Sequence, residues 1–229
     1  MKRHLKRPTI SKAWPVKRRN ITFITRPNPG PHPFSLGLPL KVLLRDMLKV
    51  AKTSKEVGKL LYNNEILVDG IRRKESKFPV GIMDVIEIKK TNEYFRIVLV
   101  RGKISVLSIG KKDAEIKPCK IIGKNKVNGK IQINLYDGNN ILVDKDEYKT
   151  GDTLIITLPA HEIKEHLKLD KGSTICLIGG KHMGEIGKVE DIIADKITYK
   201  REDGDLVETL KRYVFVIGKD KPFFSLTSK

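Results

Sequence analysis

The chain has 229 residues, 46 of them Lys or Arg and 27 Asp or Glu, which gives a formal net charge of +19. Hydrophobic residues make up 39% of it, enough for a buried core, so a wholly disordered protein is excluded. The sequence has neither an apolar run long enough for a membrane span nor an apolar N-terminal stretch typical of a secretion signal. Its two cysteines, Cys119 and Cys176, lie far apart and form no paired zinc or disulfide motif.

These features predict a soluble, cytoplasmic protein without a cofactor or metal. The excess of positive charge predicts a polyanionic partner, which in the cytoplasm is typically a nucleic acid. The charge is concentrated towards the N-terminus: it is +9 in residues 1–35, +5 in residues 36–100, +3 in residues 101–170 and +2 in residues 171–229.

Residues 1–37 are predicted to form an extended basic arm, because six prolines in this stretch prevent a long helix. Residues 21–25 could form one strand or pin the arm to the globule, and a solvated disordered tail is the alternative for the whole segment. Trp14 could stack on a base or sugar, or it could anchor the arm to its own domain. The nucleic-acid-binding candidates in the arm are Lys2, Arg3, Lys6, Arg7, Lys12, Trp14, Lys17, Arg18, Arg19 and Arg26.

Residues 38–93 predict two helices followed by short strands. Pro39 is placed to start the first helix, whose apolar residues recur at helical spacing as far as Ala51. Thr53 and Glu56 have the spacing of a capping box, which predicts a second helix ending near residues 62–64. Strands at 66–68 and 85–88 follow, the first ending in an Asp69-Gly70 turn.

This segment also carries a basic surface that suits the phosphates and 2′-hydroxyls of an A-form RNA helix. The alternative is a helix face that is merely solvated. The candidates are Lys41, Arg45, Lys49, Lys52, Lys55 and Lys59 on the helices and Arg72, Arg73 and Lys74 after the turn.

Residues 94–170 alternate short β-branched runs with glycine turns, which predicts a small sandwich or a partly open barrel. His161 and His166 frame a sequence that superficially resembles a zinc-protease helix. Their i, i+5 spacing places them roughly 140° apart around a helix, so we predict a solvated linker helix there and no metal site. The glycine-rich segment 180–188 fails the phosphate-loop pattern, and we find no active site.

Residues 171–229 predict a small SH3-like barrel. Alternating Ile175 and Leu177 precede Gly180, Gly184 and Gly187, which permit tight turns and close backbone approach. A generic glycine-rich hairpin is the alternative. The candidates for RNA contact here are Lys181, His182 and Lys188.

Several of these segments resemble known RNA-binding units. Residues 63–70, Asn-Asn-Glu-Ile-Leu-Val-Asp-Gly, resemble the signature of the S4-type RNA-binding module, with Asn64 where many relatives have Gly. Residues 172–192 resemble a KOW motif. The N-terminal His4-Leu5-Lys6-Arg7 with Trp14, the segment 26–32 and the order of the parts resemble the small-subunit ribosomal protein S4e family, and the length favours its archaeal form.

The resemblance implies an α+β protein with a basic Pro-rich arm (1–37), an S4-type RNA-binding domain (38–93), a β-barrel-like central domain (94–170) and a C-terminal KOW barrel (171–229). It implies a non-enzymatic protein that binds small-subunit ribosomal RNA and neighbouring ribosomal proteins, as a monomer within the particle. Two alternatives remain: a KOW-containing transcription or translation regulatory factor, and an RNA-modifying enzyme carrying the S4-type module.

Overall fold

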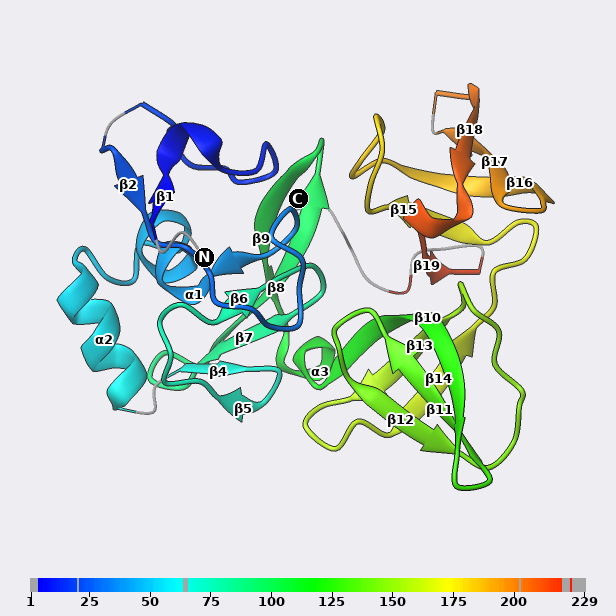
Figure 1. Cartoon of the computed structure of the whole chain (residues 1–229), viewed down its shortest axis with the longest axis horizontal. Coiled ribbons are helices and arrows are strands. Elements are labelled where there is room, and N and C mark those ends of the chain that lie inside the picture. Colours follow the sequence, from blue (N-terminus) through cyan, green and yellow to red (C-terminus); the bar gives the residue numbers. More distant parts are fainter. Residues whose placement is uncertain (1–3, 20, 64–65, 202, 220–222, 224–229) are drawn as a thin grey trace. The chain divides into compact units, whose positions relative to one another are not determined.

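The structure, a computed structural model, describes residues 4–19, 21–63, 66–201, 203–219 and 223 (Figure 1). The chain divides into two units, residues 1–98 with 103–115 and residues 99–102 with 116–229. Both are built mainly from antiparallel strands, and the described helices are few and short. The fold is therefore mostly β, whereas the sequence predicts an α+β protein with longer helices.

The N-terminal segment is packed onto the first unit, which differs from the predicted extended arm. Strand β1 (Leu5–Lys6) pairs antiparallel with β2 (Phe23–Ile24). Trp14 is 3% exposed, and its Nε1–H donates to the carbonyl of Gly37 at 3.0 Å. Of the two roles considered for Trp14, the structure shows the anchor. The described part of this segment packs on the first unit because its few apolar side chains contact residues far along the chain, which local composition does not reveal.

The core of the first unit is a five-stranded sheet in the order β5-β4-β7-β8-β9. Strands β3 and β6 form a separate two-stranded sheet in the same unit. The strands are β3 (Leu38–Pro39), β4 (Ile66–Val68), β5 (Ile71–Arg72), β6 (Pro79–Val80), β7 (Val85–Ile88), β8 (Glu93–Val100) and β9 (Lys103–Ile109), and the short helix α3 (Lys111–Ala114) follows. The predicted turn between β4 and β5 is confirmed, because Asp69 and Gly70 both have positive φ, 52° and 73°.

The first predicted helix is shorter than its apolar pattern suggests. Helix α1 (Leu40–Val42) continues as a π-helical turn, Leu43–Met47. Lys49 has a positive φ of 55°, so the helix has ended before it and Ala51 lies beyond the helix. The apolar pattern continues past this point because Ala51 is still buried, although it lies outside the helix.

The second helix, α2 (Ser54–Tyr62), confirms the predicted capping box. The Glu56 N–H donates to Thr53 Oγ1 at 3.2 Å, and Glu56 Oε2 accepts the Thr53 N–H at 3.3 Å. These hydrogen bonds satisfy amide groups that the start of a helix otherwise leaves without partners. Val57 and Leu61 form the buried face of the helix. Asn64, part of the S4-type signature, lies outside the described residues.

The second unit contains two further five-stranded sheets, in the orders β12-β11-β10-β13-β14 and β18-β17-β16-β15-β19. The strands of the first are β10 (Ile116–Val127), β11 (Lys130–Leu135), β12 (Asn140–Val143), β13 (Thr153–Thr157) and β14 (Ile163–Leu167). Those of the second are β15 (Thr174–Leu177), β16 (Ile186–Ile193), β17 (Lys196–Arg201), β18 (Leu206–Leu210) and β19 (Val214–Gly218).

The linker helix predicted over residues 161–166 is wrong, because Ile163–Leu167 form strand β14. Its residues pair antiparallel with β13, with Leu154 opposite His166 and Thr153 opposite Leu167. Its exposed residues Lys164 and Glu165 suit an edge strand as well as a solvated helix, so the side chains alone did not distinguish the two.

The glycines predicted to shape the last sheet have the expected geometry. Gly180 and Gly184 have positive φ values of 84° and 86°. A Cβ on Gly187 would lie 2.6 Å from the carbonyl oxygen of Lys200, so only glycine allows β16 to pair this closely with β17.

Strand β13 is buried on both faces and belongs to two cores. Leu154 and Ile156 pack in a cluster with residues of β10 and β11. Ile155 points the other way and packs in a cluster with residues of the last sheet, such as Ile175 and Val216. The two sheets of the second unit thus share an apolar layer.

Candidate nucleic-acid interface

The structure places the candidate residues in three classes of exposure. Arg7 and Trp14 are buried, and Arg7 donates from Nη1 to the Lys17 carbonyl at 2.8 Å. The half-buried candidates are Arg26, Lys41, Arg45, Arg72, Arg73 and His182, and the exposed ones are Lys6, Lys12, Lys17, Arg18, Arg19, Lys49, Lys52, Lys55, Lys59, Lys74, Lys181 and Lys188. Lys2 and Arg3 lie outside the described residues.

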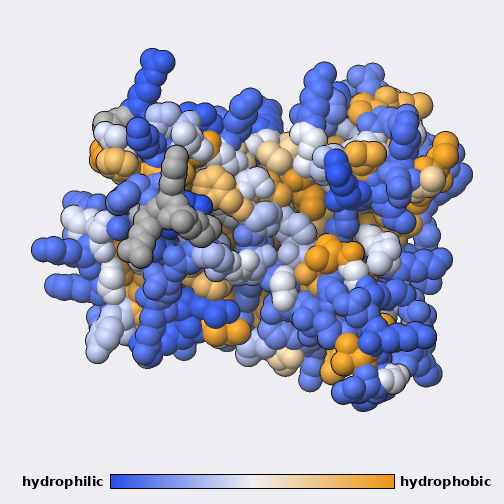
Figure 2. Space-filling view, viewed as in Figure 1, coloured by the Kyte–Doolittle hydropathy of each residue, from blue (hydrophilic) through white to orange (hydrophobic). Residues whose placement is uncertain are grey.

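Helix α2 presents cations on the side opposite its buried face. Lys55 and Lys59 lie one helical turn apart and are exposed, whereas Val57 and Leu61 face the core. Figure 2 shows hydrophilic side chains projecting from the surface over this helix. The capping box orients the helix and so fixes where both ammonium groups emerge.

Three of the predicted arginines are held by groups of the protein itself. Arg45 makes a two-pronged ion pair with its neighbour Asp46, with Nε–Oδ1 and Nη2–Oδ2 distances of 2.8 Å. Arg72 donates from Nη2 to the Tyr62 carbonyl at 2.6 Å, and the Arg73 guanidinium lies 4.5 Å from the centre of the Phe78 ring. The exposed lysines of this surface are therefore more accessible to a ligand than these three arginines.

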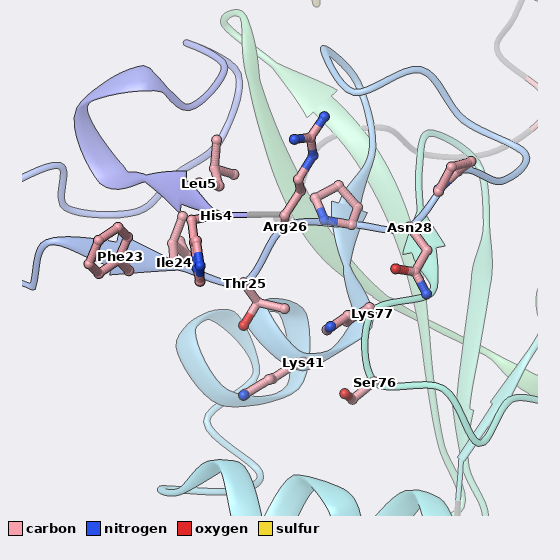
Figure 3. A pocket seen from close by; sticks show the side chains of 12 residues that line it. His4, Leu5, Phe23, Ile24, Thr25, Arg26, Asn28, Lys41, Ser76 and Lys77 are labelled. Atoms are coloured by element: carbon pink, nitrogen blue, oxygen red, sulfur yellow. The ribbon is translucent and has the colours of Figure 1, made fainter. Parts of the chain in front are cut away.

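A pocket of about 570 Å³ opens in the first unit where the N-terminal segment meets α1 and the loop before β6 (Figure 3). It brings together Arg26 and Lys41, two candidates from separate segments of the sequence. Sequence reasoning missed Lys77, which lies beside them because Lys41 and Ser76 are joined by a backbone hydrogen bond. The lining residues are His4, Leu5, Phe23, Ile24, Thr25, Arg26, Pro27, Asn28, Pro29, Lys41, Ser76 and Lys77.

Among the described residues that line the pocket, none is acidic. Burial lowers the pKa of the Lys41 ammonium, and the positive charges of Arg45 and Lys77 lower it further, against the opposing effect of Asp46. Like charges gathered in one place favour the binding of an anion, which relieves their repulsion.

One predicted contact residue of the glycine-rich loop, His182, is already engaged by other side chains of the protein. His182 Nδ1 lies 3.0 Å from Glu185 Oε1, and Arg201 Nε lies 2.8 Å from Glu185 Oε2. The Tyr199 hydroxyl also donates to Glu185, at 3.1 Å. Lys181 and Lys188 remain exposed. Arg201, which sequence reasoning missed, is placed here by the pairing of β16 with β17.

The described residues hold no group of three or more His, Cys, Asp or Glu side chains arranged for a metal ion. His166 instead pairs with Asp152, at an Nε2–Oδ2 distance of 2.7 Å. Among the described helices, none is long and apolar enough to cross a membrane. Both cysteines are buried, and burial raises the pKa of the Cys176 thiol to about 12.

Two family models match the chain: the Ribosomal family S4e over residues 91–163 and the RS4NT (NUC023) domain over residues 1–35. The small ribosomal subunit protein eS4 of Methanosphaera stadtmanae is 40% identical over 233 residues, which cover 98% of this chain and 96% of that protein. The chain belongs to the ribosomal protein eS4 family. The protein of the same name from Methanocaldococcus jannaschii is 40% identical over 240 residues and 98% of each chain.

A solved eS4 structure agrees with this assignment. The crystal structure of the 30S ribosomal protein S4e from Thermoplasma acidophilum matches with a TM-score of 0.70 and 30% identity, over 80% of this chain and 96% of that one. The comparisons confirm the predicted family, and the relatives named here are archaeal.

Proposed function

We propose that this eS4 protein binds small-subunit ribosomal RNA through the exposed cations of its first unit, with further contacts from Lys181 and Lys188. Membership of the eS4 family makes the chain a structural, non-enzymatic constituent of the small ribosomal subunit. Neighbouring ribosomal proteins are the other expected partners, with one copy of the chain in each particle.

The observation that carries the proposal is the exposure of lysines and arginines on ordered backbone. Lys12, Lys17, Arg18 and Arg19 lie exposed on a segment that Trp14 anchors, and Lys55 and Lys59 lie exposed on α2. Among the residues that the structure describes, these side chains form no ion pair with an acid. A phosphate backbone can therefore neutralise them without breaking an ion pair, although Arg18 Nη2 also donates to the Ile10 carbonyl at 3.5 Å. A preformed cationic surface loses little entropy on binding.

The test is the salt dependence of binding to a transcript of the small-subunit ribosomal RNA. Changing Lys12, Lys17, Arg18 and Arg19 together to Gln should weaken binding and lower the slope of log K against log salt by about 3, since each phosphate contact contributes about 0.7–0.9. The matched control changes four exposed lysines of the second unit, Lys145, Lys149, Lys164 and Lys168, to Gln and so removes the same charge. An unchanged slope in the fourfold variant would contradict the proposal.

A further inference from the structure

The walls of the pocket in Figure 3 are braced by backbone hydrogen bonds between separate segments. Leu5 pairs with Ile24 across β1 and β2. The Asn28 N–H donates to the Lys77 carbonyl at 2.9 Å, and the Lys41 N–H donates to the Ser76 carbonyl at 2.9 Å. The pocket is therefore formed before any ligand arrives, so binding does not carry the cost of ordering its walls.

The two ends of the pocket differ in chemistry. At one end Phe23 is 52% exposed, and its ring lies 5.7 Å from that of His4 at an interplanar angle of 54°. The other part of the lining contains Lys41, Ser76 and Lys77 (Figure 3), and the charge of Lys77 acts on the Lys41 ammonium. Figure 2 shows the hydrophobic patch that β2 leaves at the surface. An exposed aromatic ring beside clustered ammonium groups suits a molecule with one flat apolar part and one anionic part.

We propose that this pocket receives one unstacked nucleotide of the bound RNA, with its base against Phe23 and its phosphate between Lys41 and Lys77. The inference rests on the proposed function and adds to it a preference for irregular RNA. Thr25 and Asn28 supply further neutral hydrogen-bonding groups in the lining of the pocket. The volume of about 570 Å³ lies within the range of about 300–1,000 Å³ typical of small-ligand sites.

A regular duplex does not satisfy this arrangement. Its bases are stacked on both faces, and the pocket needs a base that has left the stack. A bulge, loop or strand end offers such a base, and stacking on an aromatic side chain then tolerates any base identity. The phosphates of a duplex can still bind the exposed lysines of α2, so the two kinds of contact are separable.

The test compares an RNA stem that carries one bulged nucleotide with the same stem lacking the bulge. The wild-type chain should bind the bulged stem about tenfold more tightly, as expected for one stacked base. Phe23→Ala should remove most of this preference and leave the affinity for the plain stem unchanged, and Phe23→Tyr should retain it. Because Phe23 is half exposed, the alanine variant should fold, which thermal unfolding of each variant checks.

Two double variants distinguish a phosphate contact in the pocket from phosphate contacts with the exposed lysines of α2. Lys41→Gln with Lys77→Gln should weaken binding of the bulged stem more than that of the plain stem. Lys55→Gln with Lys59→Gln removes the same charge from α2 and should weaken both equally. Equal binding of the two stems by the wild-type chain, or a preference retained by Phe23→Ala, overturns the pocket proposal while leaving the proposed function standing. If Lys55→Gln with Lys59→Gln leaves the affinity for the plain stem unchanged, this result contradicts the proposed function itself.

Discussion

Nε2 of His32 lies 2.8 Å from Oδ2 of Asp84 and 3.0 Å from Oδ1, although the two residues are 52 positions apart. Both side chains are buried, at 0% and 2% exposure. Asp84 Oδ2 also accepts the Gly81 N–H at 2.8 Å. The carboxylate therefore connects the proline-rich N-terminal segment to the turn before β7, and it does so inside the first unit.

Asp84→Ala should lower the free energy of unfolding of the first unit by about 1–3 kcal/mol, because it removes the buried acceptor that faces the Gly81 N–H and His32 Nε2. Urea denaturation measures the loss. Asp84→Asn, which keeps an oxygen for the Gly81 N–H, should cost less. If His32→Ala and Asp84→Ala simply add in the double variant, the two residues do not act as a pair.

Removal of residues 1–35 should destabilise the first unit, and not merely reduce its charge. The deletion takes away Trp14 and His32, both buried, and the backbone hydrogen bond from Ile104 to Ala13 at 2.8 Å. Amide hydrogen exchange should then show faster exchange in β7 and β8. The fourfold Gln variant of the exposed cations is the control, and its exchange should match the wild type. A deletion variant with wild-type protection would show that the segment is the extended arm that the sequence suggests.

The sequence predicts well the features that depend on near neighbours. The capping box of Thr53 and Glu56 and the Asp69-Gly70 turn need only a few adjacent residues, so their types are sufficient to identify them. The packing of Trp14 on Gly37 and of His32 on Asp84 depends on residues 23 and 52 positions away. Nine cations and six prolines dominate the composition of residues 1–35, so the composition does not indicate that a few residues there are buried.

Gly58→Ala should stabilise the protein by about 0.5–1 kcal/mol, because glycine in a helix interior costs that amount relative to alanine. A Cβ at this position of α2 meets no atom within 4 Å. Thermal unfolding should show a higher Tm. Gly81→Ala is the opposite case, since its Cβ would lie 2.3 Å from Cγ of the His32 ring, and its Tm should fall. A lower Tm for Gly58→Ala would mean that α2 is not helical at this position.

Lys120 should make the stability of the second unit depend on pH in the alkaline range. Its Nζ donates to the carbonyls of Lys211, Arg212 and Val214, and burial lowers its pKa from 10.5 to about 8, with a smaller effect from the charge of Lys211. Between these two values the unfolded chain holds a proton that the folded chain has lost. The free energy of unfolding should therefore rise with pH from about 8 to 10.5, and the contribution of Lys120 should be constant below about pH 8, where both states are protonated.

The comparison variant is Lys120→Met, which keeps the length of the side chain without its charge. The stability of the wild-type chain relative to this variant should increase by at most about 1.4 kcal/mol per pH unit between pH 8 and 10.5. Chemical denaturation of both proteins at several pH values measures the difference. A constant difference across the range would show that Lys120 keeps its ordinary pKa in the folded state.

The secondary structure around His166 illustrates a second limit of sequence reasoning. The spacing of His161 and His166 argues against a helical zinc motif, but the linker helix predicted there is wrong, because residues 163–167 form a strand. Its conformation comes from pairing with β13, a strand that lies earlier in the chain. Tertiary pairing overrides local propensity most easily in short, polar, edge segments of this kind.

The apolar layer shared by the two sheets of the second unit restricts how eS4 proteins can exchange parts. Ile116, Ile155, Leu167 and Leu169 come from the first sheet and its following loop, yet they pack with Ile175 and its neighbours in the last one. A chimaera that takes its last barrel from a relative must therefore take matching residues at these four positions too. Substitutions on the two sides of the layer should accordingly arise in compensating sets among natural relatives, with the volume of the whole cluster held nearly constant.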